Sequence, residues 1–379
     1  MGGMREPVTF IHSADWQLGM TRRYLSDEAQ ARFTGDRVAT IRTIGDLAER
    51  EDAQFIVVAG DVFETPNLSR RDIGRACEAM AEIGRPIFLL PGNHDPLGPG
   101  SIWTRRDLTD SLPDSVTVLD GEGPFEVSRD VEIVAVPWRS KDPGRDPVTG
   151  ILDTLEPTEK TRILVGHGML DELDPDRDST KTVDTGALRQ AVTDGLVDYV
   201  ALGDRHICWI DEVTGAVNYS GAHESTSFRE STRGTVLSVR IEDGRARAER
   251  REVGTWLHTE LTRELTSSAD LDLLREDLAA VWQKDRAIVR TELSGTLSMA
   301  AAAELDRLLD DQQQIFAAIF PWERKKLELV IIPDESDEDA LGLSGFAADA
   351  MAELRELAEG GSQSANDALR LLYRLGGAR

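Results

Sequence analysis

Five short polar motifs, each directly after an apolar run, constrain this sequence more than any other feature. In chain order they are Asp15-Trp16-Gln17, Gly60-Asp61-Val62-Phe63-Glu64, Gly92-Asn93-His94-Asp95, Gly166-His167-Gly168 and Gly203-Asp204-Arg205-His206. The runs that precede the first three, 8–14, 54–59 and 86–91, have the length of buried strands, and helical periodicity over 27–50 and 68–83 separates them. This rhythm predicts right-handed crossovers and a parallel sheet, in which residues at the carboxyl ends of strands converge on one crevice.

The rest of the chain divides into further strands and a second pattern. Strands are expected at 133–136, 162–165, 197–202 and 218–221, followed by a hairpin of 235–241 and 245–250 that turns at Asp243-Gly244. After 254 the pattern becomes strand 256–265, helix 271–283, strand 287–293, helix 300–316 and strand 326–332. We therefore expect a catalytic domain at 1–254 and a smaller α+β domain at 255–333. An acidic linker and two amphipathic helices, 346–358 and 365–375, make up 334–379.

Composition narrows the classes of function. With 379 residues, of which 40% are hydrophobic, the chain is long enough for more than one domain with a core. A net charge of −26 argues against a protein that coats DNA by bulk electrostatics, but cations and local arginines can offset that charge in a nuclease site. Cys77 and Cys208 are too few and too far apart for a disulfide framework or a thiolate metal site, which fits the reducing cytosol. No run approaches the ~20 apolar residues of a membrane span and no signal peptide is evident, so we expect a cytoplasmic protein away from membranes.

The residue types in the five motifs are those that a two-metal site requires. Two divalent ions about 4 Å apart can hold a phosphodiester, generate hydroxide from water and stabilise the leaving oxygen. Asp61 is the natural bridge between the ions. Asp15, Gln17 and His206 would complete one ion's shell, and Asn93, His167 and Asp204 the other. Each residue alone is an ordinary turn former or loop histidine; five motifs in series favour the metal site.

Other polar residues have more open roles. His94 follows a ligand position and can face the substrate, where it would donate a proton to the departing oxygen; the alternative is a third nitrogen ligand or a structural histidine. Glu64 could orient His94 or a water, or simply begin a helix. The pairs Arg22-Arg23, Arg70-Arg71 and Arg105-Arg106 follow motifs and are candidates for phosphate contacts, with solvated helix ends as the alternative.

At these residues the chain resembles the calcineurin-like metallophosphoesterases. The stretches 10–19, 60–64, 91–95 and 219–221 are most similar to the SbcD-type nuclease subunits of bacterial double-strand-break repair complexes. That resemblance implies a four-layer αββα sandwich with a smaller α+β capping domain and C-terminal helices. It also implies manganese dependence, with magnesium as the other option, dimerisation through the catalytic domain, DNA as substrate and an SMC-family ATPase partner of the SbcC type.

Two positions depart from the family pattern. The family usually has Asp-x-His where this chain has Asp15-Trp16-Gln17, and Gly-His-x-His where it has Gly203-Asp204-Arg205-His206. Both exchanges replace an imidazole with a side-chain oxygen, so the site would have three carboxylate ligands instead of two. We therefore expect a preference for manganese or magnesium over zinc.

The leading hypothesis is a two-metal DNA exonuclease or endonuclease that acts in double-strand-break repair. A second hypothesis keeps the site but changes the substrate to a cyclic nucleotide or a phosphoprotein. A third is a DNA-end-binding scaffold whose site has drifted.

Overall fold

The structure is a computed structural model that describes residues 5–140, 144, 146, 148–175, 182–322, 329–332 and 345–376. The chain forms two compact units. The first comprises the chain up to Arg23 together with Gln30–Trp256, and the second comprises Tyr24–Ala29 and the chain from Leu257 onward. In the part of the chain that the structure describes, no helix is long and apolar enough to cross a membrane.

Two six-stranded sheets form the centre of the first unit. The first sheet has the order β12-β11-β1-β2-β3-β4, and its parallel strands are β1 (Val8–Ser13), β2 (Phe55–Val58), β3 (Ile87–Leu89) and β4 (Val116–Val118). The second has the order β5-β6-β7-β8-β10-β9, and its parallel strands are β6 (Val131–Ala135), β7 (Thr161–His167), β8 (Tyr199–Gly203) and β10 (Val217–Tyr219). The antiparallel strands are β5 (Phe125–Ser128), β9 (Trp209–Ile210), β11 (Thr235–Glu242) and β12 (Arg245–Glu252).

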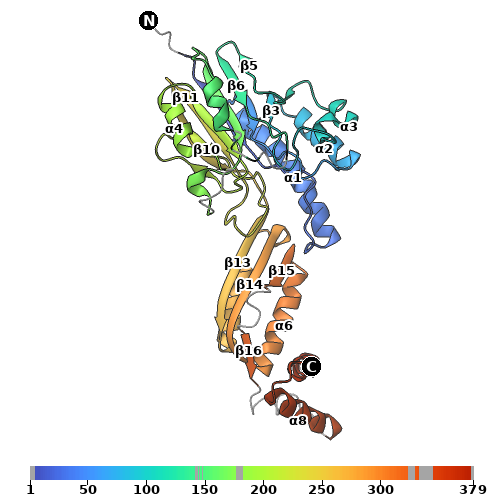
Figure 1. Ribbon diagram of the computed structural model, residues 1–379. Coiled ribbons are helices and arrows are strands. Elements are labelled where there is room, and N and C mark those ends of the chain that lie inside the picture. Colours follow the sequence, from blue (N-terminus) through green and yellow to red (C-terminus); the bar gives the residue numbers. More distant parts are fainter. Residues whose placement is uncertain are drawn as a thin grey trace. The chain divides into compact units, whose positions relative to one another are not determined.

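Helices cover the outer face of each sheet. The helices α1 (Asp27–Arg50) and α2 (Arg70–Ala81) share one core with the first sheet, and α4 (Thr185–Thr193) shares another with the second (Figure 1). Shorter helical segments are α3 (Arg106–Thr109) and the 3₁₀ turns Ile102–Thr104, Thr149–Thr154 and Asp171–Leu173. Alternate strand residues supply a third core between the two sheets. The expected four-layer αββα sandwich is thus confirmed.

Aromatic side chains hold the two sheets together. Phe10 of β1 stacks on Phe55 of β2, with ring centroids 5.0 Å apart, and both belong to the first sheet. The edge of Tyr199, in β8 of the second sheet, lies 5.4 Å from Phe10 at 83°. All three are fully buried, so this contact sets how closely the sheets approach.

Most expected elements of the first unit are present, and the differences lie at sheet edges. The hairpin turn is confirmed, since Asp243 (φ 51°) and Gly244 (φ 70°) both adopt the left-handed backbone that a two-residue hairpin turn needs. The short strands β4, β5 and β9 were not predicted. Each has four residues or fewer, and the partly exposed alternation of β5 leaves little hydrophobic signal.

The second unit is a parallel sheet with helices. Its strands are β13 (Leu257–Leu265), β14 (Ala287–Ser298), β15 (Ala318–Pro321) and β16 (Leu329–Ile332), and β14 pairs with the other three. Its helices are α5 (Ser268–Ala280), α6 (Met299–Gln313), α8 (Phe346–Glu359) and α9 (Gln363–Gly376), with a 3₁₀ turn at Lys284–Arg286. Leu369 of α9 packs against Met299 and Ala303 of α6. The two C-terminal helices are as expected.

Two boundaries in this unit differ from expectation. The helix α5 begins three residues early because Ser267 and Asp270 form a capping box. The helix expected at 300–316 ends at Gln313, and β15, which was not predicted, follows it. The acidic linker at 333–339 lies outside the described residues.

The aromatic contact between the sheets yields a stability prediction. We expect Phe10→Ala to lower the free energy of unfolding of the first unit by about 3–5 kcal/mol, because it opens a cavity beside Phe55 and Tyr199. Val213→Ala serves as control, since Val213 is 71% exposed and its truncation should change stability by less than about 0.5 kcal/mol. Urea unfolding followed by tryptophan fluorescence measures both; equal midpoints for the two variants would contradict the assigned role of Phe10.

Candidate metal centre

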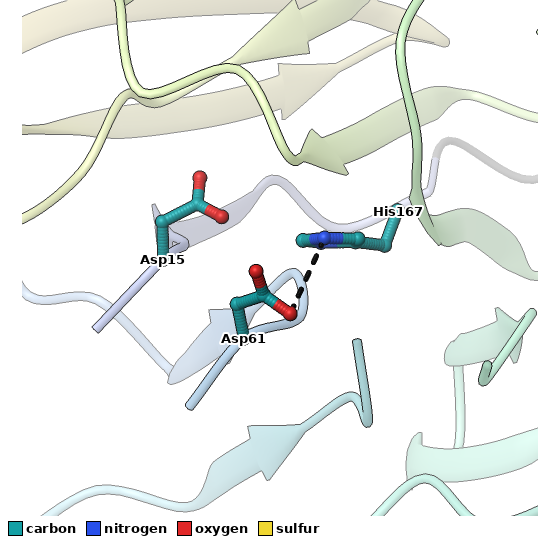
Figure 2. A group of neighbouring side chains, drawn as sticks. All are labelled: Asp15, Asp61 and His167. Atoms are coloured by element: carbon teal, nitrogen blue, oxygen red, sulfur yellow. Dashed lines mark ion pairs between the residues drawn. The ribbon is translucent and has the colours of Figure 1, made fainter. Parts of the chain in front are cut away.

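The predicted site residues converge at the carboxyl ends of strands from both sheets. Asp15 follows β1, Asp61 follows β2, and His167 ends β7. One possible ligand atom from each of these three residues lies within 4.8 Å of the other two, and all three side chains are buried. Figure 2 shows the two carboxylates and the imidazole facing one another across the same small space.

Backbone hydrogen bonds fix the loops that carry these side chains. The N–H groups of Asp15 and Gln17 donate to the carbonyls of Gly60 (3.1 Å) and Asp61 (2.8 Å). Between them, the carbonyl of Trp16 accepts two hydrogen bonds from the buried guanidinium of Arg37, at 3.1 and 2.9 Å. The first two motifs are therefore held as one rigid pair of loops.

Four of the predicted ligands lie in the left-handed region of backbone space. The φ angles are 52° at Asp15, 42° at Gln17, 51° at Asp61 and 91° at Asp204. This conformation is uncommon for residues other than glycine and is found where the surrounding structure enforces it. Here it turns each chain sharply at the end of its strand. The sequence shows no sign of it beyond the tolerance of Asp for such turns.

His167 is oriented by a hydrogen bond to the backbone. Its Nδ1 donates to the carbonyl of Ala59 at 2.8 Å, so Nε2 is the nitrogen presented to the site. That atom lies 3.5 Å from Oδ1 of Asp61 and 3.8 Å from Oδ1 of Asp204. The side-chain amide of Asn93 lies 2.8 Å away. The structure thus brings Asn93, His167 and Asp204 together beside Asp61.

His206 is oriented in the same manner from the other side. Its Nδ1 lies 2.7 Å from Oγ1 of Thr226 and 3.5 Å from Oε1 of Glu230. Its Nε2 lies 3.3 Å from the amide nitrogen of Gln17 and 3.9 Å from Oδ1 of Asp15. Asp15, Gln17 and His206 therefore form a second group. Thr226 and Glu230 were not predicted, because they stand outside the five motifs and meet His206 only in the folded chain.

The charges of the site are strongly coupled. Burial raises the pKa of Asp15 to about 6, against the opposing charges of His206 and His167. Burial alone would lower the pKa of His206, but its hydrogen bond to Glu230 and the charge of Asp15 outweigh burial and raise that pKa to about 9. Burial likewise acts against the charged form of His167, yet Asp61 raises the pKa of His167 well above its usual value. Without a metal, protons supply the positive charge that the carboxylates require.

The residues present fit divalent cations. Oδ2 of Asp15 and Oε1 of Gln17 are buried, and neither has a hydrogen-bond partner in the described part of the chain. Buried acceptor oxygens without donors are costly, and a cation would satisfy them. Three carboxylates, two imidazoles and two amide side chains form a ligand set of oxygen and nitrogen, which suits divalent metals. A metal must displace the imidazole protons, so its binding will depend on pH.

His94 and Glu64 lie together at the edge of this group. The backbone N–H of His94 donates to Oδ1 of Asp61 at 2.9 Å, and its Nδ1 donates to the carbonyl of Glu64 at 3.1 Å. The Glu64 carboxylate lies 3.5 Å from the same ring nitrogen. His94 is thus held with Nε2 available for another partner. Asp95, to which no role was assigned, accepts hydrogen bonds from the N–H groups of Gly92 (2.7 Å) and Phe63 (3.0 Å) and so joins the second and third motifs.

The predicted arginines differ in their positions. Arg22 is half-buried and donates to the carbonyl of Thr226 at 2.8 Å, which places it beside His206. Arg23, Arg70 and Arg71 are exposed, and no contact among the described residues joins them to the metal ligands. Arg105 pairs with Asp107 at 2.6 Å and supports the backbone at Pro66 and Leu68, which is a structural role.

Gly60 gives the clearest test of this geometry. A Cβ at Gly60 would lie 2.1 Å from Nδ1 of His167, and its φ is +94°, so Gly60→Ala should displace the imidazole. We expect manganese affinity to fall at least about 10-fold, as when the support of a metal ligand is lost. The matched control is Gly74→Ala on α2, where an added Cβ meets nothing within 4 Å. Calorimetric titration measures both; unchanged affinity in Gly60→Ala would contradict the assignment of His167.

Comparisons with known proteins agree with this site. The profile of the calcineurin-like phosphoesterase family matches residues 8–208. The chain is 32% identical over 133 residues to the uncharacterized metallophosphoesterase YhaO of Bacillus subtilis, covering 33% of this chain and 31% of that protein. It is 28% identical over 253 residues to the DNA double-strand break repair protein Mre11 of Archaeoglobus fulgidus, covering 60% and 52%. It is 26% identical over 247 residues to the SbcD component of the nuclease SbcCD of Staphylococcus epidermidis, covering 59% and 63%.

In each case the chain spans less than two thirds of the relative's length. The family profile, by contrast, covers more than half of the 379 residues and includes all five motifs up to His206. The chain therefore belongs to the calcineurin-like phosphoesterase family.

Proposed function

We propose that this protein is a two-metal phosphodiesterase that cleaves DNA in double-strand-break repair. The observation that carries the proposal is the buried cluster of Asp15, Asp61 and His167, whose ligand atoms lie within 4.8 Å of one another at the meeting point of two sheets. Relatives named as a repair protein and as part of a nuclease support DNA as the substrate.

The side chains divide into two groups around Asp61. Asp15, Gln17 and His206 would hold one ion, Asn93, His167 and Asp204 the other, and Asp61 would bridge them. When bound, the ions supply positive charge that holds the phosphodiester and increases the acidity of water. The protein contributes the fixed positions of its ligands: the hydrogen bond from His167 to Ala59 and the contact of His206 with Thr226 direct Nε2 of both rings into the site.

His94 is the residue placed to assist the leaving group. Its Nδ1 donates to the Glu64 carbonyl, so Nε2 is free to give a proton to the departing oxygen. The Glu64 carboxylate at 3.5 Å stabilises the protonated imidazole and holds its orientation. We assign His94 as the proton donor and Glu64 as its positioning residue.

The proposal extends to organisation and partners. The domains are 1–254 for catalysis, 255–333 as a capping domain and 334–379 as a linker with C-terminal helices. By its resemblance to SbcD-type nucleases, we propose that the chain forms a homodimer and acts on DNA with an SMC-family ATPase, in the cytoplasm. The second candidate function, hydrolysis of another phosphoester, rests on the match to YhaO, whose name specifies no substrate.

Loss of the bridging carboxylate tests the activity. Asp61→Asn should reduce manganese-dependent release of nucleotides from end-labelled linear duplex DNA at least about 100-fold, because the bridge between the ions is lost. Asp243→Asn is the matched control: Asp243 has the same φ of 51° but lies in the hairpin turn, and its activity should be unchanged. Metal-stripped protein that gains no activity with manganese, while binding it, would overturn the DNA substrate.

The oxygen-rich ligand set predicts metal selectivity. In competition at equal concentration, the protein should retain manganese or magnesium activity in preference to binding zinc. The variant Gln17→His/Asp204→His restores the usual imidazoles and should shift the preference toward zinc; histidine is among the residues that tolerate the left-handed backbone of both positions. Competitive binding followed by metal analysis measures the shift. Clear zinc preference in the unmodified protein would contradict the assignment of Gln17 and Asp204.

A further inference from the structure

A pocket of about 420 Å³ opens beside the metal ligands Asp204 and His206. Its volume is in the range of about 300–1,000 Å³ that is typical of small-molecule sites. Its walls include three arginines and three apolar side chains, namely Arg22, Arg205, Arg229, Met169, Leu173 and Ile207. The pocket thus adjoins the catalytic centre and has a composition different from it.

The pocket is locally cationic in a chain of net charge −26. Glu230, the carboxylate that lines it besides Asp204, is already engaged by the N–H of Thr226 at 2.8 Å and the hydroxyl of Ser227 at 3.1 Å. Arg22 is held by the Thr226 carbonyl and keeps further N–H donors. Arg205 has no hydrogen-bond or ion-pair partner within the described residues, and its Nε is buried. A buried, uncommitted guanidinium beside a phosphoester site favours an anionic or aromatic ligand.

The apolar side of the pocket restricts the ligand further. Ile207 is 39% exposed, and Met169 and Leu173 are half-buried on the other wall. Aliphatic side chains and the flat face of a guanidinium both pack well on the face of a nucleobase. A ligand that carries phosphate alone would leave these apolar walls without a partner. A nucleotide matches both halves of the pocket.

We propose that this pocket binds the nucleoside next to the scissile phosphodiester, with Arg205 as its principal contact. The inference rests on the proposed phosphodiesterase function and adds a base-binding subsite to it. Because stacking involves the face of the base, the subsite accepts every base and distinguishes nucleotides from other phosphodiesters. Leu173 supplies the apolar contact at a distance from the metal ligands.

Two synthetic diesters with the same leaving group test the subsite. These are thymidine 5′-(p-nitrophenyl phosphate) and methyl p-nitrophenyl phosphate, assayed with manganese. The unmodified protein should favour the nucleoside diester by about tenfold or more in kcat/KM, which is the scale of one base-stacking contact. Arg205→Met and Leu173→Ser should each reduce this ratio at least threefold. Arg247→Met, an exposed arginine on β12, should leave it unchanged.

The ratio separates the subsite from the metal centre, since a loss of metal binding lowers the hydrolysis of both diesters together. A ratio near one, or a ratio unaffected by both variants, would overturn the proposal. If neither diester is hydrolysed, the proposed function has failed, and calorimetry then decides on the pocket alone. Thymidine monophosphate that binds more tightly than inorganic phosphate, and less tightly to Arg205→Met, would support a nucleotide pocket; equal binding of the two would overturn it.

Discussion

The 2.8 Å hydrogen bond from Nδ1 of His167 to the carbonyl of Ala59 joins the end of β7 to the end of β2. Each of these strands belongs to a different sheet, so the bond fixes one sheet edge against the other. It also leaves Nε2 as the nitrogen that faces Asp61. Gly60 and Gly203 permit this approach, since a Cβ at either position would come within 3.0 Å of the imidazole. The geometry of the metal centre is therefore a consequence of how the two sheets meet.

Electrostatics give the same picture of a site built for cations. Three carboxylates face two imidazoles in a space that excludes most water, and the raised pKa of His206, about 9, shows how strongly these carboxylates attract positive charge. The surroundings are acidic as well, with a net charge of −26. Arginines near the site, above all Arg22 and Arg205, therefore matter more than their number suggests. They are the groups that make approach of a phosphate favourable in an otherwise repulsive field.

Sequence reasoning reached the site because its signals are local. Each motif follows an apolar run, and in parallel sheets the carboxyl ends of such runs lie at one edge, so Asp15, Asp61 and His167 were expected to meet. Features that depend on distant partners were missed. Thr226 and Glu230 contact His206 only after folding, and the left-handed backbone at Gln17 and Asp204 is enforced by neighbouring loops. Short edge strands such as β5 carry too little hydrophobic pattern to be recognised.

The pairing of Gln17 with His206 has a consequence for the stability of the chain. These residues are 189 positions apart, and their side-chain nitrogens lie 3.3 Å from each other. An ion held by both would act as a reversible crosslink across that loop, restricting the unfolded chain much as a disulfide does. Cys77 and Cys208 are both free, so neither forms a covalent bridge. A ligand that binds only the folded state stabilises it in proportion to the logarithm of its concentration. Metal supply would then set the lifetime of the folded protein as well as its activity.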